Sequence, residues 1–134
     1  MEDIFVARLM STSAYTVSPD TLVEDAAQVM MEKGIGSVMV VDDDNQLVGI
    51  LTNTDFVKIV AERQPKDRTP VSEYMTDDVV TTTAQVSIRD VADTIMRHGF
   101  HHVPVVDEEE GVIGMITTTD LAAYLSTAEA PSPS

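Results

Sequence analysis

The chain carries a gapless internal repeat, and this feature restricts its fold more than any other. A shift of 65 positions aligns residues 10–60 with residues 75–125, and 14 of the 51 aligned positions are identical. A repeat of this kind indicates one supersecondary unit that occurs twice and does not bury its hydrophobic face alone. We therefore expect two related units, joined through the largely polar residues 62–74.

Each copy predicts the order β-α-β-β-α. The first helix of each copy opens like a capping box, with Thr21-x-x-Glu24 in one and Ser87-x-x-Asp90 in the other. Apolar residues then recur at helical spacing. The glycines expected at the C-caps of these helices are Gly34 and Gly99.

The expected strands alternate with turns in the same way in both copies. The extended segments are 16–17, 37–41 and 47–51, and their equivalents are 80–82, 102–106 and 112–116. A unit of about 55 residues has little core of its own. We expect a mixed α/β (α+β) fold in which two units related by a pseudo-two-fold axis pack through their sheets and leave two equivalent clefts.

The predicted organisation assigns 1–61 to the first domain with an N-terminal segment, 62–74 to a linker, 75–125 to the second domain and 126–134 to a disordered tail. With 43% hydrophobic residues but no Trp, three Phe and three Tyr, the core must be aliphatic. The absence of Cys excludes disulfides and thiolate chemistry. The apolar runs are too short for a membrane span, and the N-terminus does not resemble a signal peptide, so we expect a cytoplasmic protein.

The formal net charge is −15, with 23 acidic against eight basic side chains. The bases are scattered, so the surface repels nucleic acids. Acidic excess with few Lys is typical of proteins in a salt-rich cytoplasm, where ions screen self-repulsion. This pattern favours a halophilic source; the alternative is an ordinary acidic soluble protein.

The phrase GILTNTDF at 49–56 recurs as GMITTTDL at 114–121. Its Thr and the Asp three residues later form a plausible helix N-cap. The same geometry suits a ligand, because free N–H groups at a helix start attract anions and a carboxylate can accept both hydroxyl protons of a cis-diol. The two interpretations are compatible.

The duplicated order, the segment GFHHVPVVDEEEGVIGMITTTDL and its weaker copy GIGSVMVVDDDNQLVGILTNTDF resemble a tandem pair of CBS domains, a Bateman module. The resemblance covers residues 10–125. It implies a regulatory, non-catalytic module that binds AMP, ADP, ATP or S-adenosylmethionine in clefts between the repeats, requires no cofactor, and signals to a separate effector protein. It also implies a homodimer.

The resemblance also implies the ligand-binding residues. The aspartates grip the ribose hydroxyls, the threonines lie near ribose and phosphate, and adenine packs against the segments before the first strand and at the start of the second. The implied residues are Thr12, Thr16, Ile35, Gly36, Ser37, Val38, Thr52, Thr54, Asp55, Thr81, His101, His102, Val103, Pro104, Thr117, Thr119 and Asp120.

Three histidines, His98, His101 and His102, are absent from the first copy. His101 or His102 contacts a phosphate, or the histidines bind no ligand; a metal site is disfavoured because strand alternation separates His101 from His102. The acidic runs 42–44 and 108–110 lack the pattern of a calcium loop and are expected to be solvated turns.

Of the two phrases, GMITTTDL is the better candidate for an occupied site, because His101 and cleft residues of the first copy support it. GILTNTDF must take its basic group from His102.

Two other functions remain open. One is a structural dimerisation module whose nucleotide sites are degenerate, because Gly36 and Ser37 stand where the second copy has histidines. The other is an enzyme, which the absence of any nucleophile–base pair disfavours.

The charge leads to a direct prediction. The melting temperature should rise between dilute buffer and about 1 M KCl, because the Debye length falls to roughly 3 Å. Thermal melting followed by circular dichroism measures this, and equal melting temperatures at the two salt concentrations would refute the halophilic interpretation.

Overall fold

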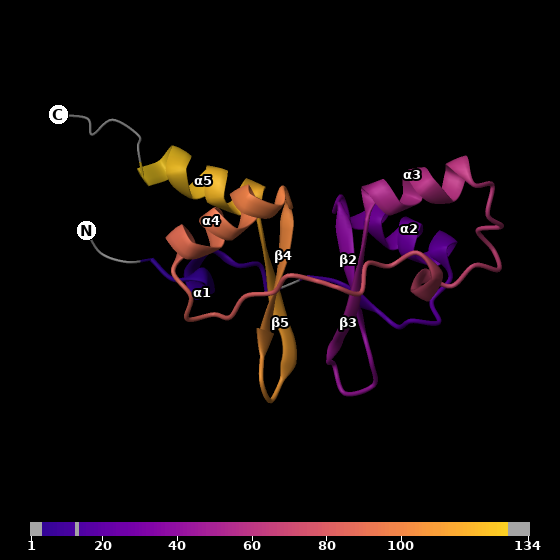
Figure 1. The fold of residues 1–134 in the computed structure, drawn as a ribbon, viewed down its shortest axis with the longest axis horizontal. Coiled ribbons are helices and arrows are strands. Elements are labelled where there is room, and N and C mark those ends of the chain that lie inside the picture. The colour runs from indigo at the N-terminus through magenta and orange to yellow at the C-terminus, as the bar shows by residue number, and fades with distance from the viewer. Residues whose placement is uncertain (1–3, 13, 129–134) are drawn as a thin grey trace. The chain divides into compact units, whose positions relative to one another are not determined.

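The computed structural model describes residues 4–12 and 14–128, which form two compact units (Figure 1). The first-repeat unit contains residues 14–79 and 109–112. The second-repeat unit contains, among the described residues, 4–12, 80–108 and 113–128. Each unit combines helices with a small sheet, which confirms the mixed fold, and the first repeat shows the predicted order β-α-β-β-α in full.

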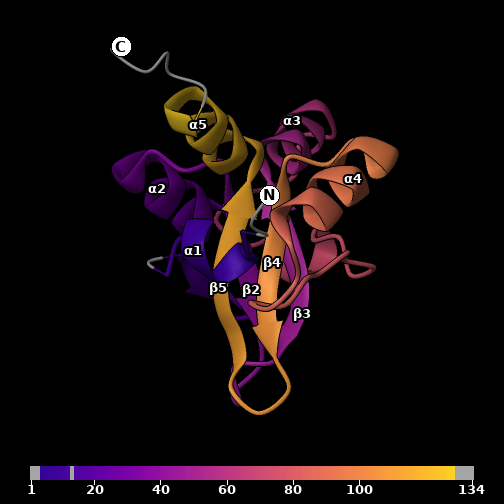
Figure 2. The ribbon, with the colours of Figure 1, turned by 90° about the vertical axis from the view of Figure 1, so that its left-hand side faces the viewer.

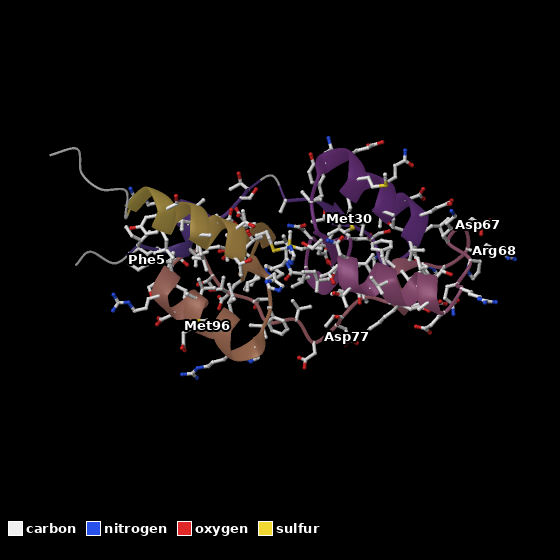
Figure 3. The ribbon with its side chains drawn as sticks, turned by 90° about the horizontal axis from the view of Figure 1, so that it is seen from above. Phe5, Met30, Asp67, Arg68, Asp77 and Met96 are labelled. Atoms are coloured by element: carbon white, nitrogen blue, oxygen red, sulfur yellow. The ribbon has the colours of Figure 1, made fainter. Side chains whose placement is uncertain are left out.

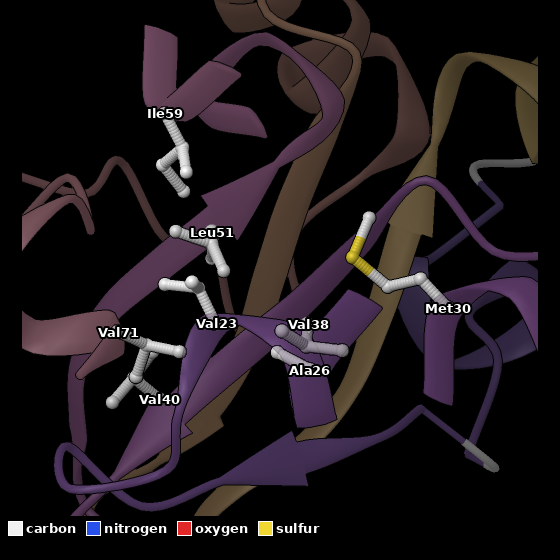
Figure 4. Packing of buried hydrophobic residues seen from close by; sticks show 8 residues of the cluster. All are labelled: Val23, Ala26, Met30, Val38, Val40, Leu51, Ile59 and Val71. Carbon is white, nitrogen blue, oxygen red and sulfur yellow. The ribbon is translucent and has the colours of Figure 1, made fainter. Parts of the chain in front are cut away.

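The first-repeat unit has a three-stranded sheet in the order β1-β2-β3. Strand β1 (Thr16–Val17) is parallel to β2 (Ser37–Val41), and β3 (Leu47–Thr52) is antiparallel to β2. Helices α2 (Val23–Lys33) and α3 (Asn53–Ala61) complete the unit. Its core is aliphatic, as predicted; Figure 4 shows Val23, Ala26, Met30, Val38, Val40, Leu51, Ile59 and Val71.

The second-repeat unit pairs β4 (His102–Asp107) with β5 (Gly111–Thr117). Its helices are α1 (Val6–Leu9), α4 (Ile88–His98) and α5 (Thr118–Ala128) (Figure 2). The predicted extended piece 80–82 forms a single parallel bridge between Thr82 and Val105. Helix α5 includes residues 126–128, which were expected in the tail; residues 129–134 lie outside the described part of the chain.

Each unit is completed by a segment that precedes the other repeat. Val6 on α1 is fully buried in the core of the second-repeat unit, and Val71 on the 3-10 turn η1 (Val71–Glu73) is fully buried in the first-repeat unit. These valines are 65 residues apart, like the two repeats. Residues 62–74, predicted as a linker, therefore include packed residues, and the predicted division into domains stays a prediction.

The helix ends follow the sequence except at one position. Gly34 and Gly99 are left-handed C-caps with φ of 63° and 71°, and the Ser87 hydroxyl accepts from the Asp90 N–H, as predicted. The predicted Thr21 cap is wrong, since the N-cap of α2 is Leu22.

Backbone carbonyls explain the missing Thr21 cap. The N–H groups of Val23 and Glu24 donate to the carbonyl oxygens of Thr69 (2.9 Å) and Lys66 (3.3 Å). These partners lie more than 40 residues away in sequence and satisfy donors that a side-chain cap would otherwise meet. The Thr21 hydroxyl instead accepts from the Ser18 N–H.

None of the helices formed by residues 4–12 and 14–128 is long and apolar enough to cross a membrane.

The two helix starts make a matched pair for mutagenesis. Ser87→Ala should lower the free energy of unfolding by about 1 kcal/mol, because it removes an N-cap acceptor. Thr21→Ala should cost clearly less, because carbonyl oxygens already satisfy the start of α2. Urea denaturation measures both, and an equal loss for the two variants would contradict this account of the caps.

Candidate functional site

In the first-repeat unit, polar groups converge where β3 passes into α3. The Asp55 carboxylate accepts the Thr52 N–H through Oδ2 (2.8 Å), within a capping box. The Asn53 N–H donates to the Gly36 carbonyl (3.2 Å), and Ser37 lies opposite Thr52 in the β2–β3 register. The strand-to-helix corner and the segment before β2 therefore form one local structure.

The second-repeat unit builds the same corner between β5 and α5. Asp120 Oδ2 accepts from the Thr117 N–H (2.9 Å) and from the Thr117 hydroxyl (3.0 Å). The Asp120 N–H donates back to Thr117 Oγ1 (3.1 Å). The Thr118 N–H donates to the His101 carbonyl (3.0 Å). The predicted cap is thus confirmed in both copies.

Each aspartate uses one oxygen for the fold and leaves the other available. The hydrogen bonds that Asp55 and Asp120 accept within the described residues all go to Oδ2. No buried polar side-chain atom in that part of the chain lacks a partner, so Oδ1 of each aspartate reaches solvent. A carboxylate oxygen beside a helix N-terminus can accept a hydroxyl hydrogen from a ligand without breaking the cap.

The other predicted residues divide by exposure. Thr54 and Thr119 are exposed in the first turns of α3 and α5, beside the aspartates, and Thr16 and Thr81 are exposed near β2 and β4. Ile35 is half-buried against the first-repeat core. The side chains of Val38 and Val103 are buried in the cores of the two units, and the Pro104 side chain is also buried. Thr12 is exposed and lies in the second-repeat unit, whereas Thr16 lies in the first.

The histidines occupy three different environments. His101 is exposed and bonds to α5 through its carbonyl. His102 is half-buried; burial lowers its pKa, and the neighbouring His101 lowers it further. The His98 ring stacks on Phe100 with centroids 5.4 Å apart. No three His, Asp or Glu side chains in the described part of the chain are placed to hold a metal ion.

One contact near the first-repeat corner was not predicted. Lys33 Nζ lies 5.2 Å from the centre of the Tyr15 ring, within the range of a cation–π interaction. Tyr15 precedes Thr16, and its carbonyl accepts from the Met39 N–H of β2. The repeat gives no signal for this contact, because the 65-residue shift aligns Tyr15 with Val80, which is not aromatic.

A separate groove of about 920 Å³ lies between α2 and α3. Its apolar lining residues include Met31 and Val60, which are 83% and 76% exposed. Met96 on α4 stands at the position equivalent to Met31 and is also 83% exposed (Figure 3). None of the corner residues lines this groove, so it is distinct from the candidate ligand site.

Known proteins resemble this chain over most of its length. The family model described as the CBS domain matches residues 6–62 and again 71–127. An uncharacterized 17.7 kDa protein of Acidianus ambivalens is 34% identical over 90% of this chain and 72% of its own length. The inosine-5′-monophosphate dehydrogenase of Aquifex aeolicus is 34% identical over 84% of this chain, which spans only 22% of that enzyme.

A solved structure has the same fold. The CBS domain pair of protein MJ0100, in complex with 5′-methylthioadenosine and S-adenosyl-L-methionine, matches with a TM-score of 0.86 and 25% identity. The match covers 96% of this chain and 100% of that chain. With two matches of one family model in tandem, this chain belongs to the CBS-domain family.

Proposed function

We propose that this chain is a regulatory module that binds an adenosyl ligand at its strand-to-helix corners. The observation that carries the proposal is the aspartate in each unit, whose Oδ2 closes the helix cap while Oδ1 reaches solvent. A ribose presents two adjacent hydroxyls to such an acceptor. The exposed Thr54 and Thr119 hydroxyls and the helix N–H groups suit the rest of the ligand.

The similarity to the MJ0100 domain pair supports the ligand class. That protein was solved with 5′-methylthioadenosine and S-adenosyl-L-methionine, which share an adenosyl group. The net charge of −15 favours a ligand with few phosphates, or the cationic sulfonium, over a triphosphate without cations. AMP and S-adenosylmethionine are accordingly better candidates than ATP.

The proposed output is regulation of an effector protein rather than catalysis by this chain. In the Aquifex inosine-5′-monophosphate dehydrogenase, the region like this chain is a minor part of an enzyme. The corners hold carboxylates and hydroxyls that are bonded to each other and to backbone groups, an arrangement suited to holding a diol. We further propose that the chain works as a homodimer in the cytoplasm.

A second candidate function is a dimerisation module without ligand. The observation that favours it is the set of exposed apolar side chains on the helices: Met31, Val57, Val60, Met96 and Leu125. Exposed apolar side chains mark protein–protein contacts where they gather in a patch.

Isothermal titration calorimetry in high KCl distinguishes the two functions. S-adenosylmethionine, 5′-methylthioadenosine and AMP are titrated into the wild type, Asp55→Asn and Asp120→Asn. Asparagine keeps an acceptor for the cap but places an amide donor where Oδ1 accepted, so affinity should fall about tenfold or more. We expect the larger loss of affinity for Asp120→Asn, because the Asp120 side chain is more accessible to a ligand than that of Asp55. Asp120 is half-buried, and Asp55 is buried, with 6% of its surface exposed.

Asp67→Asn is the matched control, because Asp67 is exposed and lies outside both corners and outside the segments expected to contact adenine. Its affinities should equal those of the wild type. Absence of heat from every ligand, together with a stable dimer in analytical ultracentrifugation, would refute ligand binding and support the dimerisation module.

The sequence predicted a phosphate contact by His101 or His102, and such a contact by His102 would require the protonated ring. The lowered pKa of His102 makes the folded state prefer the neutral ring at neutral pH. The unfolded state then binds more protons below about pH 6.5, so this group stabilises the fold above that pH and loses its contribution as the pH falls. The free energy of unfolding should therefore drop less between about pH 7.5 and pH 5.5 in His102→Gln than in the wild type.

His98→Gln serves as the control for that experiment, because His98 is exposed at the end of α4. Identical pH profiles for the wild type and His102→Gln would show that His102 is not held neutral by burial.

A further inference from the structure

The two hairpin turns meet at Asn45. Asn45 Nδ2 donates to the carbonyl oxygens of Glu110 (2.9 Å) and Val112 (2.8 Å), and the Asn45 carbonyl accepts from the Val112 N–H (3.0 Å). Asn45 and residues 109–112 belong to the same compact unit. We call these three hydrogen bonds the tip clasp.

The backbone is shaped for the tip clasp. Asn45 has a φ of 62°, in the left-handed region that Asn tolerates better than most residues. Gly111 has a φ of 79°, and a Cβ at this position would overlap the Asn45 carbonyl. Asp42 Oδ1 accepts the N–H groups of Asp44 and Gln46, both at 2.9 Å, and so fixes the turn that presents Asn45.

The tip clasp does not follow from the internal repeat. Asn45 is aligned with Glu110, and Gly111 with Gln46. A glutamate in place of Asn45 would bring acceptors, not donors, to the two carbonyls. One copy therefore provides the amide side chain, and the other provides the glycine and the backbone that it binds.

Negative charges surround the tip clasp. Asp43 and Asp44 are exposed two residues and one residue before Asn45, respectively, which places their Cα atoms within about 8 Å of it. Glu109 and Glu110 are exposed on the other turn, and neither turn contains Lys or Arg. The Debye length is about 30 Å at 0.01 M salt and roughly 3 Å at 1 M, so repulsion between exposed carboxylates on two turns in contact acts in dilute salt and is screened in concentrated salt.

We propose that the tip clasp is a salt-dependent latch. In dilute salt, the carboxylates of the two turns repel each other and open the three hydrogen bonds. In concentrated salt, screening removes the repulsion and the latch closes. Strand β3 begins next to the latch and ends at Thr52, and β5 begins in the latch and ends at Thr117. A closed latch therefore holds the first residues of both strands, at the ends opposite the corners.

Amide hydrogen exchange on the full chain tests the latch by NMR. The protection of the Val112 N–H is measured in about 0.01 M and about 1 M KCl, relative to the Ile50 N–H. The Ile50 N–H donates to the Thr76 carbonyl in the same unit and reports opening that does not involve the turns. The relative protection of Val112 should increase about tenfold with salt, as several exposed charge pairs together would produce.

Two sets of variants separate charge from hydrogen bonding. Asp43→Asn with Asp44→Asn should protect Val112 already in dilute salt, and reduce the salt effect to about twofold or less. Asp77→Asn with Asp78→Asn is the matched control, an exposed adjacent pair in the same unit, and should keep the wild-type response. Asn45→Gly keeps the left-handed backbone and Asn45→Asp keeps the shape, and both should lower Val112 protection at every salt concentration.

The latch is refuted if Val112 protection is independent of salt, or if the Asp77 and Asp78 variant changes it as much as the Asp43 and Asp44 variant. Unchanged protection in both Asn45 variants would equally refute it. These readouts need no ligand, so they are independent of the proposed function.

Discussion

The burial of two equivalent valines, Val6 and Val71, is the constraint on which the rest of the structure depends. A single repeat of about 55 residues exposes too much apolar surface to be stable by itself. Each unit closes its core with a segment that precedes the other repeat, and the backbone bonds between Ser11 and Met115 and between Ile50 and Thr76 hold these segments in place. Because the exchange is reciprocal, neither repeat retains its whole core without the other.

The complete cores fix the corners from which the candidate function arises. Leu51 and Ile116 are fully buried immediately before Thr52 and Thr117, so the strand ends are held rigidly where the final helices begin. A helix start needs acceptors for its free N–H groups, and a carboxylate meets that need with one oxygen. The second oxygen has no structural task. A requirement of the fold therefore leaves one carboxylate oxygen in each unit that the cap does not use, and the proposed ligand site depends on this oxygen.

The sequence predicted what is local and missed what is not. Ser87 caps its helix and Gly99 ends it because the relevant contacts lie within four residues. Thr21, like Ser87, is followed three residues later by an acidic residue, which is the local pattern of a capping box. The N–H groups at the start of α2 nevertheless donate to the carbonyl oxygens of Lys66 and Thr69 and not to the Thr21 hydroxyl. The 65-residue shift also aligns Val6 with Val71, although both lie outside the repeat as defined from the sequence, and the burial of each valine in the core of the other repeat depends on the three-dimensional chain path. Burial of Val38 and Val103 was likewise set by core packing that spacing alone does not reveal.

Duplication and divergence have acted on different parts of each unit. The Thr and Asp of the corners close the helix in both copies and, in the proposed function, also hold the ligand, so a change would cost stability whether or not a ligand binds. The neighbouring positions carry no such double duty and differ: Gly36 and Ser37 correspond to His101 and His102, and Asn45 corresponds to Glu110. The shared residues therefore suit one ligand class in both units. The divergent residues give the units different charge and pH response, and create the asymmetric contact at Asn45 that two identical copies would not form.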